Sequence, residues 1–162
     1  MGLGIAPGKF GARKGLIAGL IAITVNTLLL KAAPLIPIKA EGGGLLKLLL
    51  QHSGLITNHT ASLNTPIFAV AFHYLTGLTM VVVYIYLFCP AFQLSGWMKG
   101  SLFSLLPWFI NGFIVLPLLG QGWVGNNVLG FAGIIYFFIA NWLFGLILGW
   151  LYAINLEEFR VQ

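Results

Sequence analysis

The sequence predicts an all-α integral membrane protein built as a four-helix bundle, and three observations support this fold class. Apolar residues occupy 59% of the 162 positions and charged residues only 7%, whereas a soluble domain carries charge on about a quarter of its positions. The apolar residues fall into four blocks, each close to the roughly 20 residues that a helix needs to cross a bilayer. Short stretches rich in glycine, proline and polar residues separate the blocks. We therefore expect a single transmembrane domain over residues 1–162.

The fourth block is the clearest and predicts a span over about 128–154. No charged residue occurs over its length, and at about 1.5 Å of rise per residue it exceeds the roughly 30 Å of a bilayer's hydrocarbon core. Gly145 and Gly149 follow Asn141 at intervals of four residues, which places all three on one face of the helix. Because small residues let two helices approach closely, we expect this face to pack against another helix.

The first block predicts a span over about 15–33, after which Pro34 and Pro37 interrupt the helix. The connection that follows is the longest in the chain and contains the run LLKLLLQH. This run is too short to cross a bilayer. It predicts a short interfacial helix, over about 42–52, that lies along the membrane surface or packs on the bundle.

The second and third blocks also have defined ends. Thr65 can cap a helix and Pro66 is suited to its first position, so a second span is expected over about 66–89. A third is expected over about 98–117, with Pro107 inside it. Because proline removes one backbone hydrogen bond, we expect a kink at that position.

The spacing of two glycines and two asparagines indicates an internal repeat. Gly15 follows a lysine and precedes Asn26 by eleven residues, and Gly100 follows a lysine and precedes Asn111 by the same distance. The chain would then consist of two repeated helical hairpins, related by an axis along the membrane normal. The alternative, that apolar segments resemble one another through composition alone, stays open.

The basic residues lie at the ends of the apolar blocks, where they orient a membrane protein. We therefore do not expect the net charge of +5 to bind nucleic acid. With the N-terminus in the cytoplasm, that side holds Lys9, Arg13, Lys14, Lys99 and Arg160, and the opposite side holds Lys31, Lys39 and Lys47. This excess predicts cytoplasmic termini, in a membrane that we expect to be the bacterial inner membrane. The expected partners are membrane lipids and other membrane-protein subunits.

Four polar residues in the predicted spans are the candidates for a functional site: Asn26, His73, Asn111 and Asn141. Polar groups in hydrocarbon are costly unless they find partners. The first three lie near the same ends of their spans, so we expect an intramembrane polar cluster. It would either join helices through hydrogen bonds or bind a ligand.

His73 is also a candidate ligand for a cofactor. A neutral imidazole in a membrane helix, with Gly77 one turn away, is the arrangement that five-coordinate haem or a chlorin pigment would use. The alternative is a histidine that binds no cofactor and packs between helices with its hydrogen bonds satisfied. The identity of any cofactor is not predicted.

The residues give little support to an enzyme or a metal site. No Asp or Glu occurs in the predicted spans, and the sequence has no HExxH, P-loop or Ser-His-Asp pattern. The single cysteine, Cys89, excludes an internal disulfide and a multi-cysteine metal site. A lipid-modifying enzyme would need His73, His52 or His59 as its base, and we do not expect one.

Short motifs in three spans resemble those of small uncharacterised four-helix integral membrane protein families of bacteria. The first span opens with Gly15, Ala18 and Gly19, the second carries His73 followed by Gly77, and the fourth has Asn141, Gly145, Gly149 and Tyr152. Where such families often have His in the fourth span, this chain has Asn141, which argues against a paired-histidine site. The resemblance implies a fold class and no activity.

These observations favour a noncatalytic accessory subunit that packs in a larger, energy-transducing membrane complex. The expected helix-packing residues are the glycines of the three spans, namely Gly15, Gly19, Gly77, Gly145 and Gly149. The alternative is a membrane protein or carrier that binds a small molecule, a lipid or a cofactor such as haem or chlorin through the polar cluster.

Overall fold

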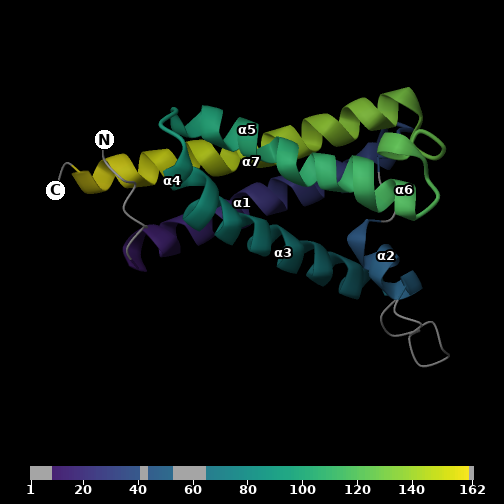
Figure 1. Ribbon diagram of the computed structural model, residues 1–162, viewed down its shortest axis with the longest axis horizontal. Coiled ribbons are helices and arrows are strands. Elements are labelled where there is room, and N and C mark those ends of the chain that lie inside the picture. The colour runs from purple at the N-terminus through teal and green to yellow at the C-terminus, as the bar shows by residue number, and fades with distance from the viewer. Residues whose placement is uncertain (1–8, 41–43, 53–64, 161–162) are drawn as a thin grey trace.

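The computed structural model describes residues 9–40, 44–52 and 65–160, and within these ranges the chain is helical and contains no β-strand (Figure 1). Four helical segments are long and apolar enough to cross a membrane: Gly11–Leu35, Pro66–Ala91, Gly96–Leu118 and Gly130–Ile154. The prediction of an all-α chain with four apolar helices of spanning length is confirmed. Such a chain is typical of a multi-pass integral membrane protein.

The first segment consists of α1 (Lys9–Ala32) and the 3-10 turn η1 (Ala33–Leu35). After this turn, the backbone N–H groups of Ile36 and Ile38 both donate to the carbonyl of Ala33, at 3.1 Å. Ala33 and Ala40 are buried. The first part of the long connection is therefore packed against the helices.

The short helix α2 (Leu45–His52) forms where an interfacial helix is predicted over 42–52, although residues 41–43 lie outside the described part of the chain. Lys47 is exposed, whereas the flanking Leu46 and Leu48 are half-buried. In Figure 1, α2 lies at the end of the molecule where α3 begins and α6 ends.

The second and third segments each contain a π turn. The second comprises α3 (Pro66–Val83), η3 (Tyr84–Phe88) and α4 (Cys89–Ala91), and the third comprises α5 (Gly96–Ile110), η4 (Asn111–Val115) and α6 (Leu116–Leu118). The Thr65 side chain caps α3 by accepting from the N–H of Phe68 at 3.2 Å, as its position before Pro66 predicts.

A single residue separates each π turn from a proline. The N–H of Cys89 donates to the carbonyl of Tyr84, five residues back, and Pro90 follows. The N–H of Leu116 donates to the carbonyl of Asn111 in the same way, and Pro117 follows. A proline ring clashes with the carbonyl four residues before it, so the wider turn lets each helix continue past its proline.

A compact turn joins the third and fourth segments. It contains the 3-10 turn η5 (Trp123–Gly125), and the N–H of Gln121 donates to the carbonyl of Leu116 at 2.9 Å. Val124 has a φ of 48°, in the left-handed region that a β-branched residue rarely adopts. The helix α7 (Gly130–Arg160) follows.

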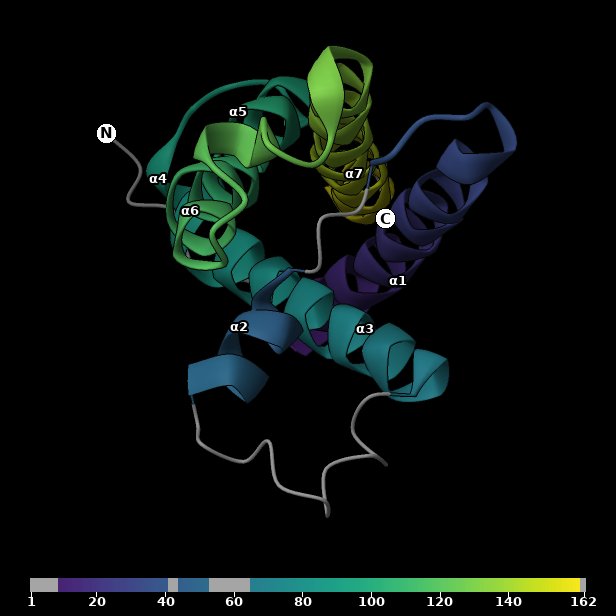
Figure 2. The ribbon, with the colours of Figure 1, turned by 90° about the vertical axis from the view of Figure 1, so that its right-hand side faces the viewer.

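The fourth helix is the centre of the packing. α7 packs on α5 and on α1, and α1 packs in turn on α3. Figure 2 looks down the long axis of the molecule and shows α7 between α5 and α1. α3 meets α5 through the π turn η3. Because the helices run alternately, α1 begins and α7 ends at the same end of the molecule (Figure 1).

α5 and α7 approach each other backbone to backbone through small residues. A Cβ atom on Gly149 would lie 2.7 Å from the backbone nitrogen of Gly100, and one on Gly145 would overlap the carbonyl oxygen of Gly100. On the α5 side, Gly96 and Ser104 flank Gly100 at four-residue intervals. They contact the same small residues of α7, Gly96 at Gly149 and Ser104 at Gly145. The small face predicted on the fourth helix thus meets a matching small face on α5.

The other three predicted packing glycines lie between α1 and the helix formed by α3 and η3. A Cβ atom on Gly15 would lie 2.9 Å from Cγ1 of Ile85, and one on Gly19 would lie 2.6 Å from Cγ1 of Val81. From the α3 side, a Cβ atom on Gly77 would lie 2.8 Å from Cγ1 of Ile23. These glycines make room for branched side chains, and Ile23, Val81 and Ile85 are buried there.

Candidate functional site

One buried asparagine joins three helices in the half of the molecule that is remote from the start of α1 and the end of α7. The Asn26 side chain, on α1, donates from Nδ2 to the backbone carbonyl of Ala140 on α7, at 2.9 Å. Its Oδ1 lies 3.2 Å from Nε2 of His73 on α3. Asn26 is 6% exposed. Two of the four polar residues proposed for the cluster therefore form a bonded pair.

The partners of Asn26 fix the proton on the imidazole. Because the amide nitrogen donates to Ala140, the oxygen faces His73 and can only accept a hydrogen bond. Nε2 of His73 must then carry the hydrogen. A metal ligated by this nitrogen would need its lone pair and would break the contact with Asn26. The geometry thus favours a packing histidine over haem or chlorin ligation through Nε2.

Two tyrosines extend this set of contacts. The Tyr74 hydroxyl on α3 donates to Oγ1 of Thr24 on α1 at 3.0 Å, and the Tyr136 hydroxyl on α7 donates to the carbonyl of Leu29 at 2.7 Å. The Thr24 hydroxyl in turn donates to the carbonyl of Leu20 at 2.8 Å. We call Asn26, His73, Thr24, Tyr74 and Tyr136 the polar seam, because they join α1 to both neighbours.

The other two predicted site residues bond within their own helices. Asn111 donates from Nδ2 to the carbonyl of Pro107 at 3.0 Å, and Asn141 donates to the carbonyl of Phe137 at 2.8 Å. Both side chains are half-buried. Each amide group thus donates a hydrogen bond within its own helix, and neither side chain reaches the polar seam. The structure therefore joins only Asn26 and His73 of the four.

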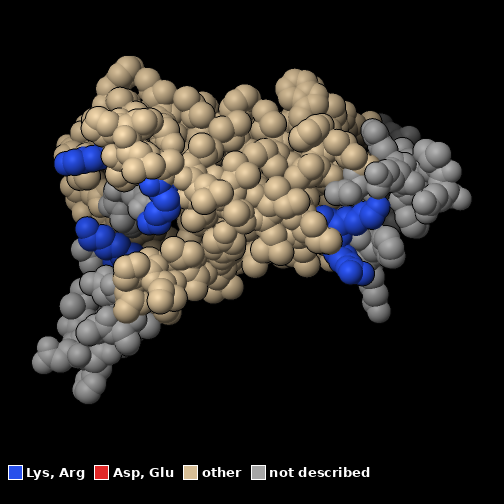
Figure 3. Space-filling view, turned by 180° about the vertical axis from the view of Figure 1, so that it is seen from behind, with Lys and Arg blue, Asp and Glu red and all other residues tan. Residues whose placement is uncertain are grey.

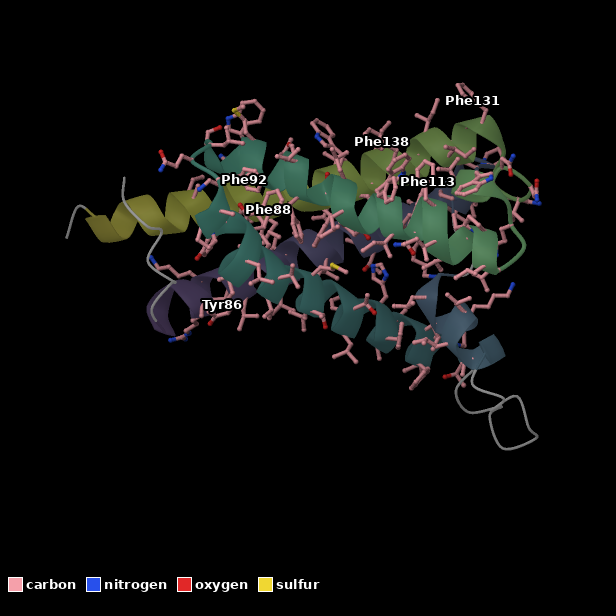
Figure 4. The ribbon with its side chains drawn as sticks, in the orientation of Figure 1. Tyr86, Phe88, Phe92, Phe113, Phe131 and Phe138 are labelled. Atoms are coloured by element: carbon pink, nitrogen blue, oxygen red, sulfur yellow. The ribbon has the colours of Figure 1, made fainter. Side chains whose placement is uncertain are left out.

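The half of the molecule nearer the termini is held by aromatic side chains instead. Tyr84, which is fully buried, lies 5.2 Å from Phe103 and 6.0 Å from Tyr152 between ring centroids. Phe88 lies 5.2 Å from Phe103 and 4.7 Å from Phe92, near the α4 end (Figure 4). These edge-on and tilted contacts link η3, α5 and α7.

A lysine closes the hairpin between α4 and α5. Nζ of Lys99 donates to the carbonyl of Cys89 at 3.1 Å and lies 3.9 Å from its Sγ. A cation at the end of a helix stabilises carbonyls that have lost their helical partners. From the sequence, Lys99 is expected only to orient the chain and to precede Gly100 in the repeat. The proximity of Pro90 is the one signal that a free carbonyl would lie nearby.

The polar seam can donate and accept hydrogen bonds, and it contains one histidine, His73, beside the two tyrosines. Over the described ranges, no three His, Cys, Asp or Glu side chains come together as a metal site would require. The contacts that the seam makes are suited to holding three helices in register. No protein-family model, characterised protein or solved structure matches this chain.

Proposed function

We propose that this chain is a noncatalytic subunit of a larger membrane complex, in which other subunits pack against α3. The observation that carries the proposal is how little of this helix the chain itself covers. Only 11% of the spanning window of Pro66–Ala91 is buried, against 39% for Gly11–Leu35. A membrane helix covered to so small an extent leaves most of its surface for lipid or for another protein.

The uncovered surface of α3 is a regular stripe. Its members follow one another at intervals of three or four residues and are all exposed: Ala71, Leu75, Thr79, Val82 and Tyr86. Such spacing places them on one helix face. Thr79 donates its hydroxyl to the carbonyl of Leu75 at 2.9 Å, so its polarity is satisfied. Ala71 and Thr79 are small, which suits close approach of a partner helix. We call these five residues, of which Tyr86 lies on η3, the α3 outer face.

The polar seam supports the noncatalytic part of the proposal. Asn26 bonds to Ala140 and His73, and the two tyrosines bond to α1. These groups hold helices together, and reaction chemistry would have to break contacts that stabilise the fold. The energy-transducing nature of the complex stays a prediction from the sequence.

We also propose that the four helices form one bundle in the bacterial inner membrane, with both termini in the cytoplasm. The common end of α1 and α7 supports placing both termini on one side (Figure 1). The two-hairpin repeat has less support, because Asn26 bonds to α7 and α3 whereas Asn111 bonds to its own helix.

Site-specific photo-cross-linking in native membranes tests the subunit proposal. A photoreactive residue at Leu75 or Thr79 should give a discrete polypeptide adduct, because these positions lie on the α3 outer face. The matched control is Leu105, which is 41% exposed near the middle of the α5 segment. Only lipid adducts at all three positions, or the same polypeptide adducts at all three, would refute the proposal.

A further inference from the structure

Three lysines surround the end of the molecule that is remote from the termini. Lys31 ends α1, Lys39 lies in the connection after η1, and Lys47 lies on α2. All three side chains are exposed. Figure 3 shows basic side chains gathered at both ends of the visible face and none on the surface between them. We call Lys31, Lys39 and Lys47 the cationic rim.

The backbone that carries Lys39 is fixed in place. Its carbonyl lies so close to Gly133 of α7 that a Cβ atom on this glycine would overlap it. The neighbouring Ala40 is 2% exposed and packs with Ala140 and Leu30. The Lys39 side chain therefore extends from a segment that α7 holds.

Apolar side chains are exposed at the same end. Between Lys31 and Lys39, Leu35 is 83% exposed and Ile36 is 53% exposed, and at the start of α3 Ile67 is 82% exposed. Alternation of lysines with exposed aliphatic side chains is typical of the boundary between acyl chains and headgroups. A protein surface that faces only water would not favour this mixture of lysines and exposed aliphatic side chains.

From these observations we infer that the cationic rim is a contact surface for anionic phospholipid headgroups. The phosphates of an anionic lipid would lie against the three ammonium groups, while Leu35, Ile36 and Ile67 enter the acyl region. The occupant is lipid and not free phosphate, because the exposed aliphatic side chains need an apolar neighbour. Glu41, the acidic residue of this connection, lies outside the described residues.

The inference also explains the lysines that oppose the predicted orientation. Basic residues on the translocated side of a membrane protein run against the usual charge bias. A headgroup contact gives these three lysines a reason to be there. It does not depend on the proposed contact of α3 with a partner.

Native mass spectrometry of the purified full chain tests the inference. After reconstitution in equal parts of phosphatidylglycerol and phosphatidylcholine, the retained lipid should be enriched in phosphatidylglycerol. Each neutralised lysine should weaken the binding of phosphatidylglycerol at the rim about fivefold, so K39Q/K47Q should clearly lower the enrichment. The charge-preserving variant K39R/K47R should retain it, and far-UV circular dichroism checks the helical content of both.

Salt provides a second measurement on the unaltered chain. The enrichment should fall when ionic strength rises from about 0.1 to about 1 M, because the screening length shortens from about 10 to about 3 Å. Equal retention of the two lipids by the unaltered chain, an unchanged enrichment in K39Q/K47Q, or an enrichment indifferent to salt would each overturn the inference.

Discussion

Replacing Gly100 by alanine tests whether α5 and α7 really meet backbone to backbone. The added methyl carbon would lie 2.8 Å from the carbonyl carbon of Gly145 and 2.9 Å from Cα of Gly149, and it would overlap the Gly145 oxygen. None of these atoms can rotate away, since all belong to the backbone of α7. The helices must therefore move apart along the whole small-residue contact.

Two opposing effects determine how much Gly100→Ala changes the free energy of unfolding. Overpacking costs about 1 to 3 kcal/mol, and we take about 3 kcal/mol because the obstacle is backbone. Alanine is favoured over glycine within a helix by about 1 kcal/mol. The expected net loss in the free energy of unfolding is about 2 kcal/mol, or roughly 30-fold in the unfolding equilibrium.

Gly112, in the same spanning segment, supplies the matched control. A Cβ atom there would lie 2.9 Å from one terminal methyl, Cγ1 of Val124, and 3.7 Å from the next atoms. A cost of about 1 kcal/mol is then offset by the helical preference for alanine of about 1 kcal/mol, so Gly112→Ala should be nearly neutral.

Reversible unfolding in mixed micelles, followed by circular dichroism at increasing denaturing detergent, measures both variants. Gly100→Ala should lower the midpoint clearly, and Gly112→Ala should leave it almost unchanged. Equal stability of Gly100→Ala and the unaltered chain would refute the backbone contact, and so would a larger loss in Gly112→Ala.

Three further outcomes follow from the described contacts. In a double-mutant cycle, Asn26→Leu and His73→Leu should show a coupling of about 0.6 to 1.7 kcal/mol in the same unfolding assay, and simple additivity would show that the hydrogen bond contributes nothing. The purified chain should lack a Soret or chlorin absorption band both before and after His73→Ala, whereas a band that this substitution removes would show pigment ligation. Val124→Asn should raise stability by about 1 kcal/mol, because asparagine tolerates the left-handed φ of 48° better than a β-branched residue does, and a lower unfolding midpoint would show that packing of the valine outweighs this strain.

Several features of the fold can be predicted from composition and spacing. Four charge-poor blocks predict four apolar helices, and Thr65 with Pro66 predicts the start of α3. The four-residue spacing of Gly145 and Gly149 predicts a contact face, because helical periodicity alone puts them together. Such signals are local, so the sequence contains them directly.

Other features depend on how distant segments meet. Gly96, Gly100 and Ser104 have the same four-residue spacing as the small residues of α7, and a search for that spacing would have found the matching face. The π turns could have been sought before Pro90 and Pro117. No local signal distinguishes Asn26, which reaches α7, from Asn111, which bonds to its own helix, because the choice depends on the distance to a neighbouring helix.

The alternating membrane crossings are tested most directly by labelling single cysteines with a membrane-impermeant maleimide. In a Cys89→Ala background, one cysteine replaces Lys39, Ser95 or Asn127, which are exposed and lie in successive connections. In intact bacterial cells we expect labelling at positions 39 and 127, and at position 95 only after the membrane is opened. Labelling of all three positions from the same side would contradict the four crossings on which the fold and the proposed function depend.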